Sequence, residues 1–259
     1  MKRSQGKVKR VVKSALVILL LLASCVPGPE DSGASLIRMA GGSFPPASLP
    51  AAHADIFQAI GQAAWEAPPA SFGVRELTEE EALLITGSSW TLASPVGLEE
   101  LAMVTVGYWD FDGTERQGQL IVAKELGSEV MDIFQELYEA GFPMGNIRLI
   151  EEFDAEDTRS MEANNTYAFC TRNIAGTRRY SLHSYGVAVD INPVQNPYLV
   201  GGEVYPSSGN DYLNRQDVRP GMITPGDACY NAFTSRGWSW GGYWASPDYQ
   251  HFEKPLPID

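Results

Sequence analysis

The chain has 259 residues, and its 32 acidic side chains outnumber 19 basic ones, so the formal net charge is −13 at pH 7. So acidic a chain is a poor partner for nucleic acid or for anionic lipid, because both are polyanions. Only three cysteines are present, which excludes a cysteine-rich zinc knuckle.

Residues 1–24 are predicted to be a secretory signal peptide of the lipoprotein type. Six cations precede a short apolar run, residues 15–23, which is about half the roughly 20 residues that a membrane-spanning helix needs. The LASC sequence that ends at Cys25 resembles the bacterial lipobox, in which the cysteine receives lipid; the alternative is ordinary cleavage nearby, with Cys25 incidental. We therefore expect an exported protein, lipid-anchored through Cys25 at the bacterial cell envelope. Its mature part keeps 13 basic and 32 acidic residues, a net charge near −19.

Residues 25–73 are predicted to be a tether or linker, because Pro, Gly, Ala and Ser dominate them. A short amphipathic helix is compatible with residues 55–66, although Gly61 weakens this prediction. Residues 74–259 then form the globular part, and about 185 residues suit one domain.

Periodicity and turn residues predict the main elements of this globular part. In chain order they are a helical turn that leads into a strand (98–109), a turn (112–113), a strand (119–123), a helix (127–140) and a further strand (146–153). Because there is no regular βαβ alternation, the class we expect is α+β, a single domain with a mainly antiparallel sheet flanked by helices.

Two cysteines, Cys170 and Cys229, remain after Cys25. In an exported chain such a pair is compatible with a disulfide, and we expect these two to form one. Two buried free thiols are the alternative.

The segment SLHSYGVAVDIN, residues 181–192, is predicted to be a loop that turns into a strand. Asp190 falls on the strand face opposite to the apolar residues, which are Val187, Val189 and Ile191. His183 lies seven residues before Asp190, on a loop that Gly186 permits. A loop that turns into a strand can direct both side chains to one point.

A second histidine, His251, follows a segment rich in Trp, Gly and Tyr. Together His183, Asp190 and His251 would supply two nitrogens and one carboxylate to zinc and leave a fourth position for water, the pattern of a catalytic site. The alternative is that these histidines face solvent or form ordinary hydrogen bonds. In the preceding segment we expect Trp238 and Trp240 to be core residues; Trp244 or Tyr243 would line a peptide groove.

The pattern S-x-H-x-x-G-x-A-x-D, followed about sixty residues later by an acidic residue, two residues and His, resembles the M15 zinc peptidases. These are the D-alanyl-D-alanine carboxypeptidases, dipeptidases and related endopeptidases of bacterial cell walls. Other segments resemble the branch with L-alanyl-D-glutamate peptidase-type enzymes, and the resemblance spans roughly residues 75–257. The segments, in order, are 160–161, 163–166, 169–172, 190–193, 196–198 and 237–242.

This resemblance implies a DD-peptidase/hedgehog-type zinc fold and one zinc ion on His183, Asp190 and His251. It also implies hydrolysis of peptide bonds in peptidoglycan stem peptides, of either the D-Ala–D-Ala carboxypeptidase or the L-Ala–D-Glu endopeptidase type. A non-catalytic zinc-containing module that binds cell-wall peptides is the alternative, because fold alone does not establish catalysis.

The resemblance assigns the general base to Asp248, and the alternative role for this residue is capping of a loop. Glu253 is a rival, because it lies two residues from His251 and on the same side of an extended segment; otherwise it supports the ligands. Arg172 is expected to polarise the scissile carbonyl, with Arg159 in reserve and a surface ion pair as the alternative for either. Ser181 is a candidate to bond the outer atoms of a ligand.

Overall fold

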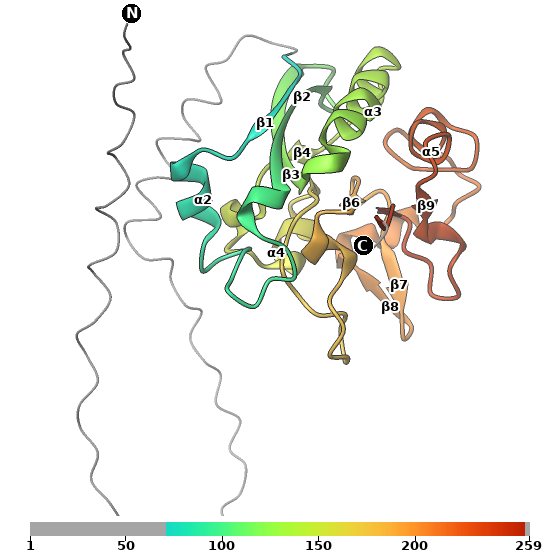
Figure 1. Ribbon diagram of the computed structural model, residues 1–259. Helices are drawn as coiled ribbons and strands as arrows, with labels where there is room; N and C mark the ends of the chain where they lie inside the picture. The colour runs from blue at the N-terminus through green and yellow to red at the C-terminus, as the bar shows by residue number, and fades with distance from the viewer. Residues whose placement is uncertain (1–70, 257–259) are drawn as a thin grey trace, which may run out of the picture. The chain divides into compact units, whose positions relative to one another are not determined.

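The computed structural model describes residues 71–256 (Figure 1). The predicted signal peptide, the expected lipidation site Cys25, the helix expected at residues 55–66 and nearly all of the predicted tether lie outside the described residues. Between residues 71 and 256, none of the helices combines the length and the apolar character needed to cross a membrane.

A three-stranded antiparallel sheet forms the first half of the described fold, with the strand order β1-β2-β3. Its strands are β1 (Gly73–Glu76), β2 (Leu101–Trp109) and β3 (Glu115–Ala123). A tight turn joins β2 to β3, where Gly113 has a positive φ of 73° and donates its N–H to the Asp110 carbonyl at 3.0 Å. The strands and the turn that we expected in this part of the sequence are therefore confirmed.

Helix α3 (Gly127–Glu139) packs against this sheet (Figure 1). Its buried side chains recur at helical spacing and include Val130, Ile133, Phe134 and Leu137. Because these side chains form one apolar stripe, the helix covers the sheet and leaves its polar face to solvent. Gly141, with a φ of 65°, follows the helix end as the sequence predicts.

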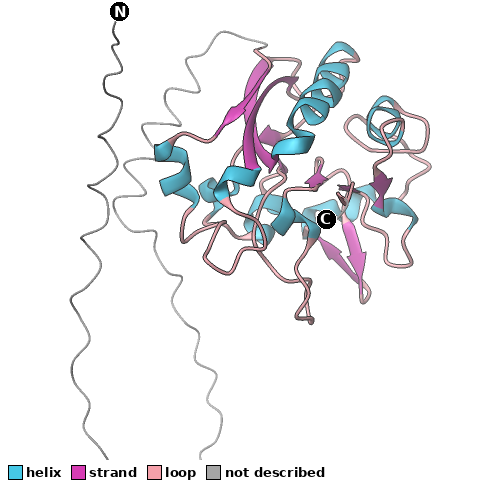
Figure 2. Cartoon of the chain, in the orientation of Figure 1, coloured by secondary structure: helices cyan, strands magenta, loops and turns pink. Residues whose placement is uncertain are grey.

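The other elements are short, and much of the chain between them is loop (Figure 2). The α-helices are α2 (Glu79–Ile85), α4 (Asp157–Glu162) and α5 (Ala228–Thr234). The short strands are β4 (Asn146–Ile147), β5 (Asn165–Thr166), β6 (Ala188–Asp190), β7 (Tyr198–Val200), β8 (Glu203–Tyr205), β9 (Ser239–Trp240) and β10 (His251–Glu253). The 3-10 helices are η1 (Leu98–Glu100), η2 (Lys124–Leu126), η3 (Ile150–Phe153), η4 (Leu182–Tyr185), η5 (Ser207–Tyr212) and η6 (Gly241–Tyr243).

A second antiparallel sheet has the order β6-β10-β9 and brings distant parts of the sequence together. Phe252 of β10 is paired with Val189 of β6 on one side and with Trp240 of β9 on the other. One apolar core then joins this sheet to the first one, since Val189 and Phe252 cluster with Val104 of β2 and Phe134 of α3. Such short strands persist because the side chains that they carry are buried in a shared core.

The strand expected at residues 146–153 is wrong beyond its first two residues. Only β4 is extended, and the chain then turns into η3, where Ile150 and Glu151 are both buried. A one-sided alternation cannot predict a segment that buries consecutive side chains. β4 pairs with β5 in parallel, whereas the two three-stranded sheets are antiparallel. The α+β class is thus confirmed, with a parallel pair beside the antiparallel sheets.

The expected disulfide is also wrong, because Cys170 and Cys229 are both buried free thiols. Cys229 lies on α5 within the main apolar core, while Cys170 belongs to a separate small cluster with Ile150 and Tyr167. Burial raises the pKa of the Cys170 thiol to about 12. An even number of cysteines says nothing about which apolar cluster each of them joins.

Candidate metal centre

His183 is positioned by a single turn of 3-10 helix, η4. Ser181 caps this turn, since its hydroxyl accepts a hydrogen bond from the His183 backbone N–H at 3.4 Å. Gly186 ends the turn with a left-handed φ of 68°, and a Cβ at this position would lie 2.5 Å from the Ala123 nitrogen. Gly186 is therefore required both for its backbone conformation and for the close approach of β3.

Asp190 and His251 are brought together by the second sheet. They are directly paired across β6 and β10, and residues paired in this way carry their side chains on the same face. The His251 Nδ1 lies 2.9 Å from Asp190 Oδ1, and the His183 Nε2 lies 3.2 Å from Asp190 Oδ2. All three side chains are buried, and their potential ligand atoms lie within 4.8 Å of one another.

The outer nitrogens of both histidines are held by acceptors. The Ala168 carbonyl lies 2.5 Å from His183 Nδ1, and Glu253 Oε2 lies 3.2 Å from His251 Nε2. Because a carbonyl and a carboxylate only accept hydrogen bonds, these outer nitrogens carry the protons. When both rings are neutral, the lone pairs of the inner nitrogens, His183 Nε2 and His251 Nδ1, are therefore available to a metal ion.

The negative charge of Asp190 is stabilised by positive charge beside it. Burial opposes the charge on His251, yet its hydrogen bonds to Asp190 and Glu253 raise its pKa to about 10. Burial likewise opposes the charge on Asp190, but the two histidines hold the pKa of that carboxyl well below its usual range. A divalent metal ion would supply the same positive charge and displace the proton. Two imidazole nitrogens and one carboxylate oxygen fit Zn²⁺.

Asp248 lies beside these residues on the loop before β10. Its backbone N–H donates to the Gly241 carbonyl at 3.1 Å, and a Cβ on Gly241 would lie 2.6 Å from the Asp248 carbonyl oxygen. The absence of a side chain at Gly241 therefore allows the backbone to pass close to Asp248. Within the described residues, the Asp248 Oδ1 is buried and has no hydrogen-bond partner. Burial and the charge of Asp190 raise the pKa of Asp248 to about 7.

Arg172 lies near the cluster, since the charge of Asp190 contributes to raising its pKa. Its Nη2 lies 3.2 Å from the Tyr167 hydroxyl and 3.2 Å from Asp157 Oδ2. The Ser184 hydroxyl accepts from the Arg172 backbone N–H and donates to its carbonyl, both at 2.9 Å. Burial opposes the charge, but Tyr167 and Asp157 raise the pKa of Arg172 further. A fixed guanidinium of this kind can stabilise negative charge on an oxygen.

The reserve residue Arg159 does not take part in this arrangement. It is half-exposed on α4 and forms ion pairs with Asp154 and Glu156. These acids lie in the same surface segment, so Arg159 has the surface role that was the alternative. This finding leaves Arg172 as the arginine at the cluster.

The aromatic residues before β10 form two groups, one buried in the core and one exposed. Trp238 and Trp240 are buried in the apolar core, as expected. Trp244 is 40% exposed, and its ring lies 5.2 Å from the His251 ring. Tyr243 is 65% exposed and contacts Tyr230 and Trp240 instead. Trp244 is thus the exposed aromatic residue that borders the cluster.

Sequence reasoning missed several residues around the site, among them Tyr167, Asp157, Ala168 and Tyr198. Tyr198 of β7 lies opposite Asp248 in an antiparallel bridge, where burial and the charge of Asp248 raise the pKa of this tyrosine. Ser181 has a different role from the expected one, because it caps η4 while a backbone carbonyl takes the outer atom of His183. A backbone carbonyl leaves no residue-type signal in a sequence. Tyr198 lay inside a matching segment without an assigned role, and Tyr167 lay between two matching segments.

The structure thus brings together a buried group of His183, Asp190 and His251 that could hold a metal ion, with a carboxylate and an arginine near it. Residues 175–254 match a family model described as D-alanyl-D-alanine carboxypeptidase, of the M15 peptidases. This match confirms the M15 resemblance and supports a peptidase. Searches of the curated proteins and of the solved structures found no match.

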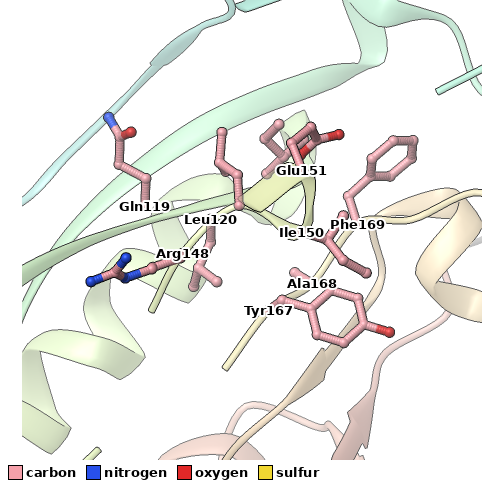
Figure 3. A pocket seen from close by; sticks show the side chains of 10 residues that line it. Gln119, Leu120, Arg148, Ile150, Glu151, Tyr167, Ala168 and Phe169 are labelled. Atoms are coloured by element: carbon pink, nitrogen blue, oxygen red, sulfur yellow. The ribbon is translucent and has the colours of Figure 1, made fainter. Parts of the chain in front are cut away.

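Glu151 is a further buried acid, outside the group of candidate metal ligands. It lines a small pocket together with Phe169, Tyr167 and Arg148, among others (Figure 3). Its Oε1 is buried and has no hydrogen-bond partner within the described residues. Burial raises the pKa of Glu151, and the nearby polar groups of Ser89 offset only part of this effect.

Replacing Glu151 by Gln should therefore stabilise the protein at alkaline pH. A pKa raised in the folded state means that the folded protein holds this proton more tightly than the unfolded chain does. The stabilisation that this proton gives to the folded state is complete below the pKa of glutamate in the unfolded chain, near 4.3. It is lost as the pH rises through the pKa of Glu151 in the folded protein. We expect Glu151→Gln to melt about 2–4 °C above wild type at pH 8, the shift for roughly 1 kcal/mol in a domain of this size, with no gain at pH 4. Melting curves between pH 4 and 8 measure this, with Glu162→Gln, an exposed acid of α4, as the control. An equal difference at both ends of the range would contradict the prediction.

Proposed function

We propose that the protein is a zinc-dependent metallopeptidase that hydrolyses peptide bonds in peptidoglycan stem peptides during cell-wall turnover. The observation that carries this proposal is the buried cluster of His183, Asp190 and His251, with Asp248 and Arg172 beside it. The match of residues 175–254 to a D-alanyl-D-alanine carboxypeptidase model supports the same reaction class. We also propose that the fold is of the DD-peptidase/hedgehog zinc type.

The side chains divide the work of hydrolysis between them. Zn²⁺ held by His183, Asp190 and His251 would lower the pKa of a bound water and polarise the scissile carbonyl. Asp248 would accept a proton from the attacking water at its unpartnered Oδ1 and return it to the leaving amine. Arg172 would donate hydrogen bonds to the carbonyl oxygen as negative charge develops there. Because water is the nucleophile, the reaction needs no serine or cysteine nucleophile.

Trp244 is the proposed contact for the substrate peptide, because it is exposed and borders His251. An aromatic side chain at such a position can pack against a peptide. The proposed cellular setting is the bacterial envelope, with the enzyme exported and attached to a membrane through lipid on Cys25. This setting is supported by the lipobox-like LASC sequence and by the charge of the N-terminal segment.

The test is incubation of the zinc-loaded mature chain with muropeptides, followed by mass spectrometry of the fragments. Loss of a terminal D-Ala would identify a carboxypeptidase, whereas separation of L-Ala from D-Glu would identify an endopeptidase. The same chain with Asp190→Asn is the control for contaminating activity. Tight muropeptide binding by a zinc-loaded sample that cleaves nothing would instead establish the second candidate, a non-catalytic binding module of the same fold.

A further inference from the structure

Tyr167 contacts two of the three proposed metal ligands. Its ring stacks on the His183 ring, with the centroids 5.0 Å apart and an interplanar angle of 16°. Its backbone pairs with Asp190 in an antiparallel bridge, through hydrogen bonds of 3.2 Å and 2.9 Å. The side chain is almost fully buried. Tyr167 is therefore fixed relative to the ligand cluster by both its ring and its backbone.

The Tyr167 hydroxyl forms a closed triangle with Asp157 and Arg172. It donates to Asp157 Oδ1 at 2.5 Å and accepts from Arg172 Nη2 at 3.2 Å. The same Nη2 lies 3.2 Å from the other carboxylate oxygen, Asp157 Oδ2. Because a charged acceptor strengthens these hydrogen bonds, one end of the guanidinium is held against a rigid ring.

The other end of the Arg172 guanidinium is left open. Within the described residues, Nε is buried without a hydrogen-bond partner, and Nη1 makes none either. A buried donor without a partner is costly, so these atoms are suited to an acceptor that arrives with the substrate. The direction of these N–H groups depends on the contacts of Nη2 with Tyr167 and Asp157, because an arginine side chain otherwise samples many rotamers.

We propose that Tyr167 is a positioning residue, which transmits the geometry of the ligand cluster to Arg172 and thereby aims its open N–H groups at the scissile carbonyl. This inference rests on the proposed function and adds to it a residue that never touches the substrate. Preorganised donors avoid reorganisation when charge develops in the transition state. The hydroxyl of Tyr167 should therefore affect turnover more than substrate binding.

The first experiment compares Tyr167→Phe with wild type in muropeptide cleavage. The phenylalanine ring keeps the stack on His183 while the hydroxyl is lost, so bound zinc should be unchanged. We expect kcat to fall about tenfold, the typical effect of one hydrogen bond to a charged group, with KM within about twofold. Tyr108→Phe, at another buried tyrosine, on β2, is the matched control and should keep its activity. In an Arg172→Ala background, Tyr167→Phe should cause no further loss.

The second experiment does not depend on turnover. In protein labelled with ¹⁵N-arginine, the Arg172 Nε–H signal is assigned by its loss in Arg172→Lys, and its exchange with solvent is measured. We expect Tyr167→Phe to speed this exchange at least tenfold while leaving that of Arg215, another partly buried arginine, unchanged. Unchanged exchange and unchanged kcat in Tyr167→Phe, or equal losses in both Arg172 backgrounds, would overturn the inference. A wild type that cleaves nothing would overturn the proposed function alone, since the exchange measurement still decides the role of Tyr167.

Discussion

Asp190→Asn is expected to abolish metal binding and peptidase activity together. Asp190 is buried and stands between both histidines, at 2.9 Å from His251 Nδ1 and 3.2 Å from His183 Nε2. An amide in its place removes the negative charge that a divalent cation needs and presents an N–H₂ group to one of the two nitrogens. The loss of zinc affinity should exceed about 100-fold, the upper range for losing a group that only supports a ligand.

The measurement is zinc content after dialysis, with affinity from competition against a chelator and activity from muropeptide cleavage. Asp112→Asn, on the exposed β2–β3 turn, is the matched control for the loss of one carboxylate. It should retain zinc and activity. An Asp190→Asn protein that is folded and still binds one zinc ion tightly would show that Asp190 is not a ligand.

Asp248→Asn should separate metal binding from catalysis. Asp248 makes no side-chain contact with the histidine nitrogens that face Asp190, so the zinc content should equal that of wild type. Its Oδ1 is buried without a partner, and the amide keeps the shape of the side chain but cannot accept a proton. We expect kcat to fall about 10²–10⁴-fold, the usual contribution of general acid–base catalysis.

Glu253→Gln is the informative comparison for this variant. Glu253 contacts the outer nitrogen of His251 at 3.2 Å, so its amide should weaken zinc binding about 10–100-fold and leave kcat largely intact once zinc is saturating. The opposite pattern, an active Asp248→Asn and an inactive zinc-loaded Glu253→Gln, would transfer the role of base to Glu253.

Much of the first half of the described fold was predictable because local patterns govern it. The β2–β3 hairpin and α3 each follow one periodicity, and glycine marks the ends where a positive φ is needed. The strand predicted at residues 146–153 was wrong because η3 buries consecutive side chains, and no single hydrophobic period describes such a pattern. The short strands β7 and β8 were missed for a related reason: three-residue strands are too short to show a period.

Residue types and their spacing were enough to identify the candidate site residues. Scarce histidines at His183 and His251, a carboxylate at Asp190 and a further one at Asp248 were all readable from residue type and spacing. The sequence also predicted that Gly186 permits a turn between His183 and Asp190, and the structure shows its left-handed φ.

The surroundings of these residues depend on contacts between distant parts of the chain. The pairing of β6 with β10 brings Asp190 next to His251, which is 61 residues away in the sequence. The contact between the Ala168 carbonyl and His183 involves only the backbone of Ala168, so the residue type at this position does not predict it. Tertiary contacts also distinguish Arg172, which pairs with Asp157 near the site, from Arg159, which forms a surface ion pair. They likewise place Cys170 and Cys229 in two different apolar clusters. Local sequence encodes conformation over a few residues, whereas these contacts are set by the shared burial of segments far apart in the chain.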